Sequence, residues 1–250
     1  MKLIILAAGQ GKRLQPLTNN KPKCLVEFNS KPIIDYILDL ADRLMIKDVI
    51  VINGYKKEVL SAHLKGRNIK FCTNQSFSET NMVHSLFCAK EFMNDDIIVS
   101  YSDIIYKKEI LQNLMDSKAD VSVVIDKKWR KLWSLRMQNP LIDAETLKIK
   151  NGKIKEIGFK PNSYDDIEGQ YIGLTKFSRG SIKKIIEYYE TLDKNKSYYD
   201  NKFSNMYLTT LLQLIIDNLI DVTPVIINGG WIEIDSLEDI NNYKTKGIIF

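Results

Sequence analysis

Short apolar runs alternate with amphipathic stretches through residues 1–101. Runs rich in Ile and Val are typical of strands buried on both faces, and the stretches between them repeat apolar residues at helical spacing. The predicted strands are Lys2–Ala8, Asp48–Ile52, Ile69–Cys72 and Ile97–Tyr101, and the predicted helices are Ile33–Leu44, Lys56–Leu64 and Asn81–Met93. This alternation predicts an α/β fold with a parallel sheet covered by helices on both faces. Ligands of such sheets bind beyond the carboxyl ends of the strands.

The pattern changes after Ala119. Residues 146–150 and 153–157 alternate with period two around Asn151-Gly152, which predicts a β-hairpin. We therefore expect a small antiparallel insertion, about residues 127–175, in an otherwise mainly parallel, Rossmann-like mixed sheet. Further helices are predicted at Ser181–Leu192 and Met206–Leu219, and further strands at Val222–Ile227 and Trp231–Ile234. No repeat or low-complexity linker divides the chain, so a single domain of residues 1–250 is expected.

Composition narrows the classes of protein. With 44% hydrophobic residues, 250 residues can form one large core. No apolar run approaches the length of about 20 residues that spans a bilayer, and no basic lead-in or cleavage site marks a signal peptide, so we expect a soluble chain. Cys24, Cys72 and Cys88 lack metal-type spacing and favour a reducing cytoplasm. A net charge of +5, spread along the chain, suits phosphorylated small molecules but not nucleic acid. The oligomeric state is left open by the sequence.

A glycine-rich segment, Leu6–Leu14, follows the first predicted strand. Its small residues let backbone N–H groups approach a triphosphate, and Lys12 and Arg13 can neutralise phosphate charge. A dinucleotide fingerprint would need glycine at Leu14, and a Walker loop would need Ser or Thr at Arg13. The alternative is an ordinary strand-to-helix turn. Pro22 stiffens the segment that carries Lys23, which favours a fixed position for that ammonium group.

Two acidic residues end apolar strands. Asp103 follows the strand at Ile97–Tyr101, and Asp235 follows the strand at Trp231–Ile234. Two such carboxylates can hold Mg²⁺ against triphosphate oxygens, because Mg²⁺ takes few protein ligands together with phosphates and water. The alternative is that either residue caps a helix. Thr80 is also a candidate helix cap.

The glycine-rich segment, together with Pro22-Lys23, resembles the signature of the sugar-nucleotidyltransferase superfamily, G-x-G-[TS]-R-L followed by P-K. Lys12 departs from the usual Thr or Ser. The resemblance implies a GT-A-like nucleotidyltransferase fold with Arg13 and Lys23 as catalytic residues and with Asp103 and Asp235 as metal ligands. It also implies nucleotide contacts from Leu6, Ala7, Ala8, Gly9, Gly11 and Lys12, and base recognition by Asn81 and Ser85.

The acceptor side is expected on two segments. Trp129, Trp133 and Arg136 share a face at helical spacing, either as a wall of the acceptor pocket or as a basic helix docked on the surface. In the superfamily a segment of the form E-x-x-x-x-G contacts the acceptor, which implicates Glu168, Gln170 and Tyr171 by resemblance.

Over its whole length the chain resembles the small cytidylyltransferase branch, most strongly in Trp129–Lys148. The resemblance implies Mg²⁺-dependent transfer of CMP from CTP to a phosphorylated metabolite, L-glutamine phosphate, in capsule phosphoramidate synthesis, giving a CDP-linked product and pyrophosphate. A choline pocket would need aromatic walls and acids, whereas the basic tract 127–136 suits a carboxylate. The alternatives are a phosphocholine or aminoethylphosphonate cytidylyltransferase, a hexose-1-phosphate nucleotidyltransferase, a nucleotide-binding regulator and a nicotinamide-dependent oxidoreductase.

Overall fold

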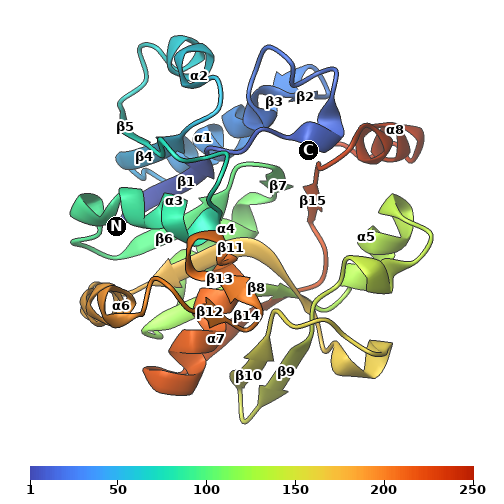
Figure 1. Cartoon of the computed structure of the whole chain (residues 1–250). Coiled ribbons are helices and arrows are strands. Elements are labelled where there is room, and N and C mark those ends of the chain that lie inside the picture. Colours follow the sequence, from blue (N-terminus) through green and yellow to red (C-terminus); the bar gives the residue numbers. More distant parts are fainter.

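The computed structural model describes residues 1–250 as a nine-stranded mixed sheet with helices on both faces (Figure 1). The strands lie in the order β5-β4-β1-β6-β11-β8-β14-β10-β9. Their bounds are β1 Lys2–Ala7, β4 Asp48–Asn53, β5 Ile69–Thr73, β6 Ile97–Tyr101, β8 Val121–Asp126, β9 Leu147–Lys150, β10 Lys153–Ile157, β11 Gln170–Phe177 and β14 Val222–Ile227. None of the helices has the length and apolar character needed to cross a membrane.

Most strands of this sheet point the same way. β5, β4, β1 and β6 are paired in parallel, as are β8 and β14, whereas β11 and β10 run against their neighbours. The mainly parallel mixed sheet expected from the sequence is therefore confirmed. The predicted hairpin also forms, with left-handed backbone at Asn151 and Gly152. It extends the edge of the central sheet through β10 and β14, and it is not a separate layer.

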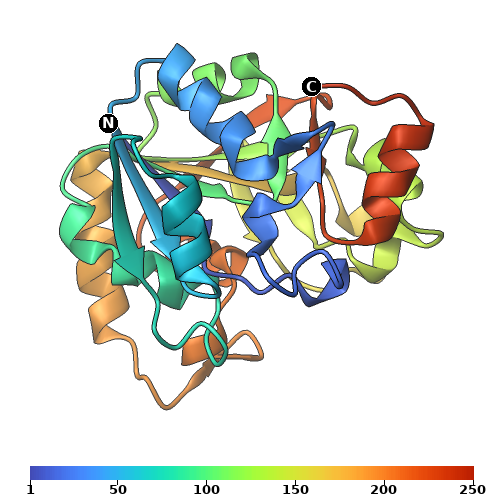
Figure 2. The same cartoon turned by 90° about the horizontal axis from the view of Figure 1, so that it is seen from above.

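Helices cover the sheet in two layers (Figure 2). Neighbouring residues of β1 point to opposite faces: Leu3 and Ile5 pack into one core cluster, and Ile4 and Leu6 pack into the other. Helices α1, α4, α5 and α8 contribute to the first cluster, and α3, α6 and α7 contribute to the second. The helices are α1 Ile33–Arg43, α2 Lys57–His63, α3 Met82–Cys88, α4 Lys108–Asp116, α5 Trp129–Arg136, α6 Arg179–Thr191, α7 Leu208–Asn218 and α8 Leu237–Thr245.

Three small two-stranded sheets stand apart from the central one. They are β2 Glu27–Phe28 with β3 Lys31–Pro32, β7 Ile104–Tyr106 with β15 Trp231–Glu233, and β12 Ser197–Tyr198 with β13 Asn201–Lys202. The β7–β15 pair joins segments far apart in the sequence, because Glu233 lies opposite Ile104 and the Ile234 N–H donates to the Asp103 carbonyl at 2.9 Å. The second acidic segment thus reaches the first through this small sheet and does not lie at an end of the central sheet.

Neither Asp103 nor Asp235 caps a helix. The N-cap of α8 is Ser236, whose side chain accepts from the Asp239 N–H in a capping box, and Asp235 is not the cap. The residue that caps α4 is Lys107, so Asp103 is not a helix cap either. Asn81 caps α3 by accepting from the Met82 N–H, whereas Thr80 instead donates to the Ser76 carbonyl. The capping alternative for Asp103 and Asp235, and the proposed cap at Thr80, are therefore wrong.

Candidate active site

The loop after β1 presents unpaired backbone donors. Gly9, Gln10 and Gly11 lie outside any helix or strand, and their N–H groups donate to no acceptor in the protein. Gly11 has φ of 64°, a left-handed conformation that glycine adopts without strain. A Cβ at Gly11 would lie 2.8 Å from Cβ of Lys23, so the loop and the lysine are packed against each other. Unpaired N–H groups in such a turn form a binding surface for an anion.

Three carboxylates face this loop. Asp103, Glu233 and Asp235 each offer an oxygen, and these oxygens lie within 4.8 Å of one another. Glu233 ends β15 and Asp235 lies two residues further on, and residues two apart in an extended chain point to the same side. One oxygen of Asp103, Oδ1, is buried without any hydrogen-bond partner. An unsatisfied buried carboxylate oxygen in a cluster of acids fits a divalent cation, whose preferred ligands are oxygens.

Two basic side chains reach into the acidic cluster. Lys23 Nζ lies 2.5 Å from Asp103 Oδ2 and also contacts Asp235 Oδ1, and Arg13 lies 3.0 Å from Asp235 Oδ2. Burial alone would raise the pKa of Asp235, but Lys23 and Arg13 outweigh it and lower the pKa to about 2. Burial also opposes the charge of Lys23, but Asp103 and Asp235 raise its pKa above the ordinary value. The pairs therefore hold Lys23 and Asp235 in their charged forms.

The position of Arg136 differs from the sequence-based expectation. Its side chain is almost fully buried and pairs with Asp235 at 3.1 Å, with Asp239 at 3.1 Å and with Glu233. A guanidinium with five donors can hold several carboxylates at once. Arg136 is absent from the walls of the two cavities described below, so its guanidinium holds the acids in place from outside them.

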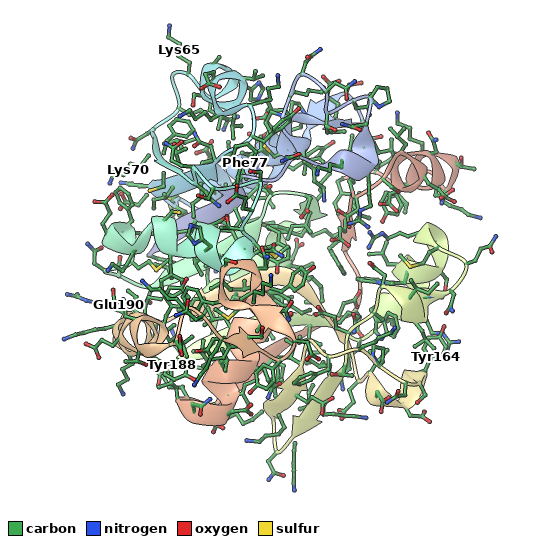
Figure 3. All side chains as sticks on the ribbon, in the orientation of Figure 1. Lys65, Lys70, Phe77, Tyr164, Tyr188 and Glu190 are labelled. Carbon is green, nitrogen blue, oxygen red and sulfur yellow. The ribbon has the colours of Figure 1, made fainter.

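Two adjoining cavities open beside these groups. The larger, of about 470 Å³, is lined by Gly9, Gly11, Lys12, Arg13, Lys23, Met82, Tyr101, Asp103, Trp133, Asp143, Glu145, Gln170, Tyr171, Ile172, Gly173, Tyr207, Thr209, Trp231, Glu233 and Asp235. The smaller, of about 130 Å³, is lined by Leu6, Ala8, Gly9, Lys23, Phe77, Thr80, Asn81, Met82, Ser85, Tyr101, Ser102 and Asp103. Figure 3 shows all side chains and labels Phe77, one of the residues that line the smaller cavity. Because Gly9, Lys23 and Asp103 belong to both walls, one ligand can extend from one cavity into the other.

The residues expected to contact the nucleotide mostly lie on these walls. Leu6, Ala8, Asn81 and Ser85 face the smaller cavity, and Gly11 and Lys12 face the larger one. Ser85 is held by Asn74, whose side-chain N–H donates to its hydroxyl at 2.9 Å. Ala7 is the exception: it is buried and lines neither cavity.

The residues expected to contact the acceptor separate into two groups. Trp133, Gln170 and Tyr171 line the larger cavity. Trp129 does not, because it packs behind Trp133 with ring centroids 5.8 Å apart. Glu168 is exposed and accepts a hydrogen bond from the Ile149 N–H at 3.2 Å, so it faces the hairpin and not the cavity.

Several wall residues were not anticipated from the sequence. They are Tyr101, Asp143, Glu145, Tyr207, Thr209, Trp231 and Glu233. Glu233 could have been found, since its spacing of two from Asp235 on a predicted strand puts both carboxylates on one side. Asp143 and Glu145 lie in the tract Trp129–Lys148 that carries the resemblance, but no site role was assigned to them, and only the folded chain brings them to the cavity.

Comparison with known proteins gives one consistent family. Residues 2–219 match the nucleotidyl transferase family. The chain is 46% identical over 247 residues to the CTP:phosphoglutamine cytidylyltransferase of Campylobacter jejuni, covering 96% of this chain and 98% of that protein. It is 27% identical to the choline-phosphate cytidylyltransferase of Streptococcus pneumoniae, covering 79% of this chain and 92% of that protein. The solved CTP:phosphocholine cytidylyltransferase from S. pneumoniae has the same fold, with a TM-score of 0.71, 24% identity and 99% of each chain covered.

Proposed function

Because this chain belongs to the nucleotidyl transferase family, we propose that it transfers CMP from CTP to a small phosphorylated metabolite, with L-glutamine phosphate as the acceptor. The observation that carries the transferase function is the meeting of Lys23, Arg13 and the three carboxylates beside unpaired loop N–H groups. The acceptor rests on the relative that is 46% identical over nearly the whole chain.

Each part of the nucleotide has a matching surface. The unpaired N–H groups of Gly9, Gln10 and Gly11 bind the triphosphate, and Lys12 and Arg13 neutralise its charge. The smaller cavity takes the base, whose edge reaches Asn81 and Ser85. The larger cavity takes the acceptor, and residues 127–175, the acceptor side of a single domain, contribute part of its walls through Trp133, Asp143, Glu145 and residues 170–173.

The reaction is an in-line displacement. An oxygen of the acceptor phosphate forms a bond to the α-phosphorus of CTP, the bond from that phosphorus to the bridging oxygen breaks, and pyrophosphate leaves with the electron pair. The attacking oxygen is already anionic at neutral pH, so no general base is needed. Lys23 holds the oxygens of the reacting phosphates and stabilises the charge that develops on them.

The carboxylates of Asp103, Asp235 and Glu233 would hold Mg²⁺. When bound, Mg²⁺ supplies positive charge to the triphosphate oxygens. Arg136 keeps Glu233 and Asp235 in place.

The test is pyrophosphate release with a panel of nucleotides and acceptors. We expect turnover with CTP and L-glutamine phosphate, and little with UTP, dTTP or glucose 1-phosphate. Phosphocholine is the second candidate acceptor, because the larger cavity has the aromatic walls and acids that a choline group needs. Binding of CTP without turnover on any acceptor would contradict the transferase function and favour a nucleotide-binding regulator. Binding of NAD would favour an oxidoreductase.

A further inference from the structure

The acceptor part of the larger cavity is acidic. Its basic wall residues, Lys12, Arg13 and Lys23, all lie on the nucleotide side. The basic tract at 127–136 contributes only Trp133 to the wall, and the guanidinium of Arg136 is taken up by carboxylates. The charged groups left on the acceptor side are Asp143 and Glu145. The expectation that this tract meets an acceptor carboxylate is therefore not supported by the geometry.

Glu145 is held firmly but has no cationic partner. The side chain of Gln170 clamps its backbone, accepting from the Glu145 N–H at 3.0 Å and donating to the Glu145 carbonyl at 2.5 Å. Its carboxylate accepts one hydrogen bond, from Thr209 at 3.3 Å, and forms no ion pair. Burial raises the pKa of Glu145 to about 7. A half-buried carboxylate fixed on a cavity wall without a counter-charge is suited to a cation supplied by a ligand.

Aromatic rings line the same cavity. Trp133 and Trp231 lie with ring centroids 5.8 Å apart, and Tyr101 and Tyr171 meet edge to face at 5.9 Å. All four line the cavity. A cation is attracted to the faces of such rings, most strongly to tryptophan. In addition, the buried indole N–H of Trp133 has no partner in the protein, so the wall also offers an unused donor.

We propose that Glu145 and this aromatic wall bind an ammonium group of the acceptor, so that the enzyme selects phosphorylated metabolites bearing a cationic nitrogen over phosphorylated sugars. This specificity rests on the proposed transferase function. It places the acceptor's phosphate beside Lys23 and its ammonium group beside Glu145, both of which line the same cavity.

The first test changes the acceptor and leaves the enzyme intact. Pyrophosphate release is measured with CTP and either L-glutamine phosphate or its Nα-acetyl derivative, which lacks the cation. We expect kcat/KM to fall on the order of 10- to 100-fold on acetylation, the range for losing a hydrogen bond to a charged group. Equal kcat/KM for the two acceptors would overturn the inference. Absence of turnover with every acceptor would instead reject the transferase function itself.

The second test uses Glu145→Gln, which keeps the shape and the acceptor for Thr209 but removes the charge. We expect a similar loss of kcat/KM with L-glutamine phosphate, no further loss with the acetylated acceptor, and an unchanged KM for CTP. Glu187→Gln, at an exposed site on α6, is the matched control. Equal losses with both acceptors would assign Glu145 a structural role only. If the variant does not fold, the comparison of the two acceptors on the native enzyme still decides.

Discussion

The ammonium nitrogen of Lys23 lies 2.5 Å from Oδ2 of Asp103, although the two residues are 80 positions apart in the chain. Lys23 comes from a short turn after the glycine-rich loop, and Asp103 comes from the link between β6 and β7. The contact therefore joins the phosphate-binding side of the site to its acidic side. Substitution of either residue disturbs the balance of charge on which we expect catalysis to depend.

Lys23→Ala is expected to lower kcat by about 10²- to 10³-fold, the range for removing one preorganised charge-stabilising donor. The reason is that Lys23 forms ion pairs with both Asp103 and Asp235, whereas Arg13 and Arg136 pair only with Asp235 of these two. Pyrophosphate release measures the effect, and circular dichroism checks the fold. Lys21→Ala, two residues away, is the control and should retain activity. A rate near that of the native enzyme would refute the role of Lys23.

Asp103→Asn is expected to remove activity at low Mg²⁺ and to weaken binding of the cation. Asn offers one neutral oxygen, whereas the buried Oδ1 of Asp103 is a charged oxygen without a partner. Titration calorimetry with Mg²⁺ and CTP measures binding directly, and pyrophosphate release measures the rate. Asp116→Asn, exposed at the end of α4, should leave both unchanged. Unaltered Mg²⁺ binding in Asp103→Asn would show that the cluster is not the cation site.

The sequence predicted the fold well because most of its elements carry strong local signals. The strand β1 is a continuous apolar run, and α5, Trp129–Arg136, matches the helical face predicted from its aromatic spacing. The glycine-rich loop and Lys23 could be recognised because their residues follow one another in a characteristic order. The glycines and Pro22 determine the backbone conformation, and the lysine supplies a charged side chain.

Side-chain partners were harder to predict. Arg136 was expected to face the acceptor because its helical face is apolar and basic, but its guanidinium pairs with three acids, on β15, on α8 and in the link between them. The pairing depends on contacts about 100 residues apart, at separations of 97 to 103. No periodicity within one segment carries that information. The acids Asp143 and Glu145 were missed for the same reason.

Gly11→Ala is expected to raise KM for CTP and to lower kcat. A Cβ at this position would lie 2.8 Å from Cβ of Lys23, which must then shift, and φ of 64° is strained for alanine. Gly66→Ala is the matched control, because Gly66 also has positive φ but has no atom within 4 Å of the added Cβ. Each variant should lose about 1 kcal/mol of stability in thermal unfolding. If both variants kept native kinetics, the close packing of the loop against Lys23 would be irrelevant to catalysis.

Arg136→Met is expected to destabilise the fold by about 3 to 5 kcal/mol, since it leaves Glu233 and Asp239 without the cation that pairs with them. Chemical denaturation measures the free energy of unfolding. Arg130→Met lies on the same helix, where the guanidinium is exposed and stacks 3.7 Å from the Tyr164 ring, and it should cost about 1 kcal/mol or less. A stable Arg136→Met protein with only a raised KM for the acceptor would return Arg136 to the acceptor wall.

The pKa of Glu145 gives a pH dependence with a definite sign. Burial raises this pKa from 4.5 to about 7. The hydrogen bond from Thr209 lowers it, Asp143 raises it, and Tyr101 and Tyr171 also lie close enough to the carboxylate to interact with it. Between pH 4.5 and about pH 7, Glu145 of the folded protein holds a proton that the same residue in the unfolded chain has released. Glu145 therefore makes the free energy of unfolding decrease as pH rises through that window.

Binding of an ammonium group requires the ionised carboxylate, so acceptor selection should move in the opposite direction. The ratio of kcat/KM for L-glutamine phosphate to that for its Nα-acetyl derivative should rise between about pH 6 and pH 8, because kcat/KM reports groups of the free enzyme. Taking the ratio cancels titration of the acceptor phosphate and of the CTP site, which the two reactions share. Glu145→Gln should give a ratio that does not change with pH. A rising ratio in that variant would assign the pH dependence to another group and remove Glu145 from acceptor selection.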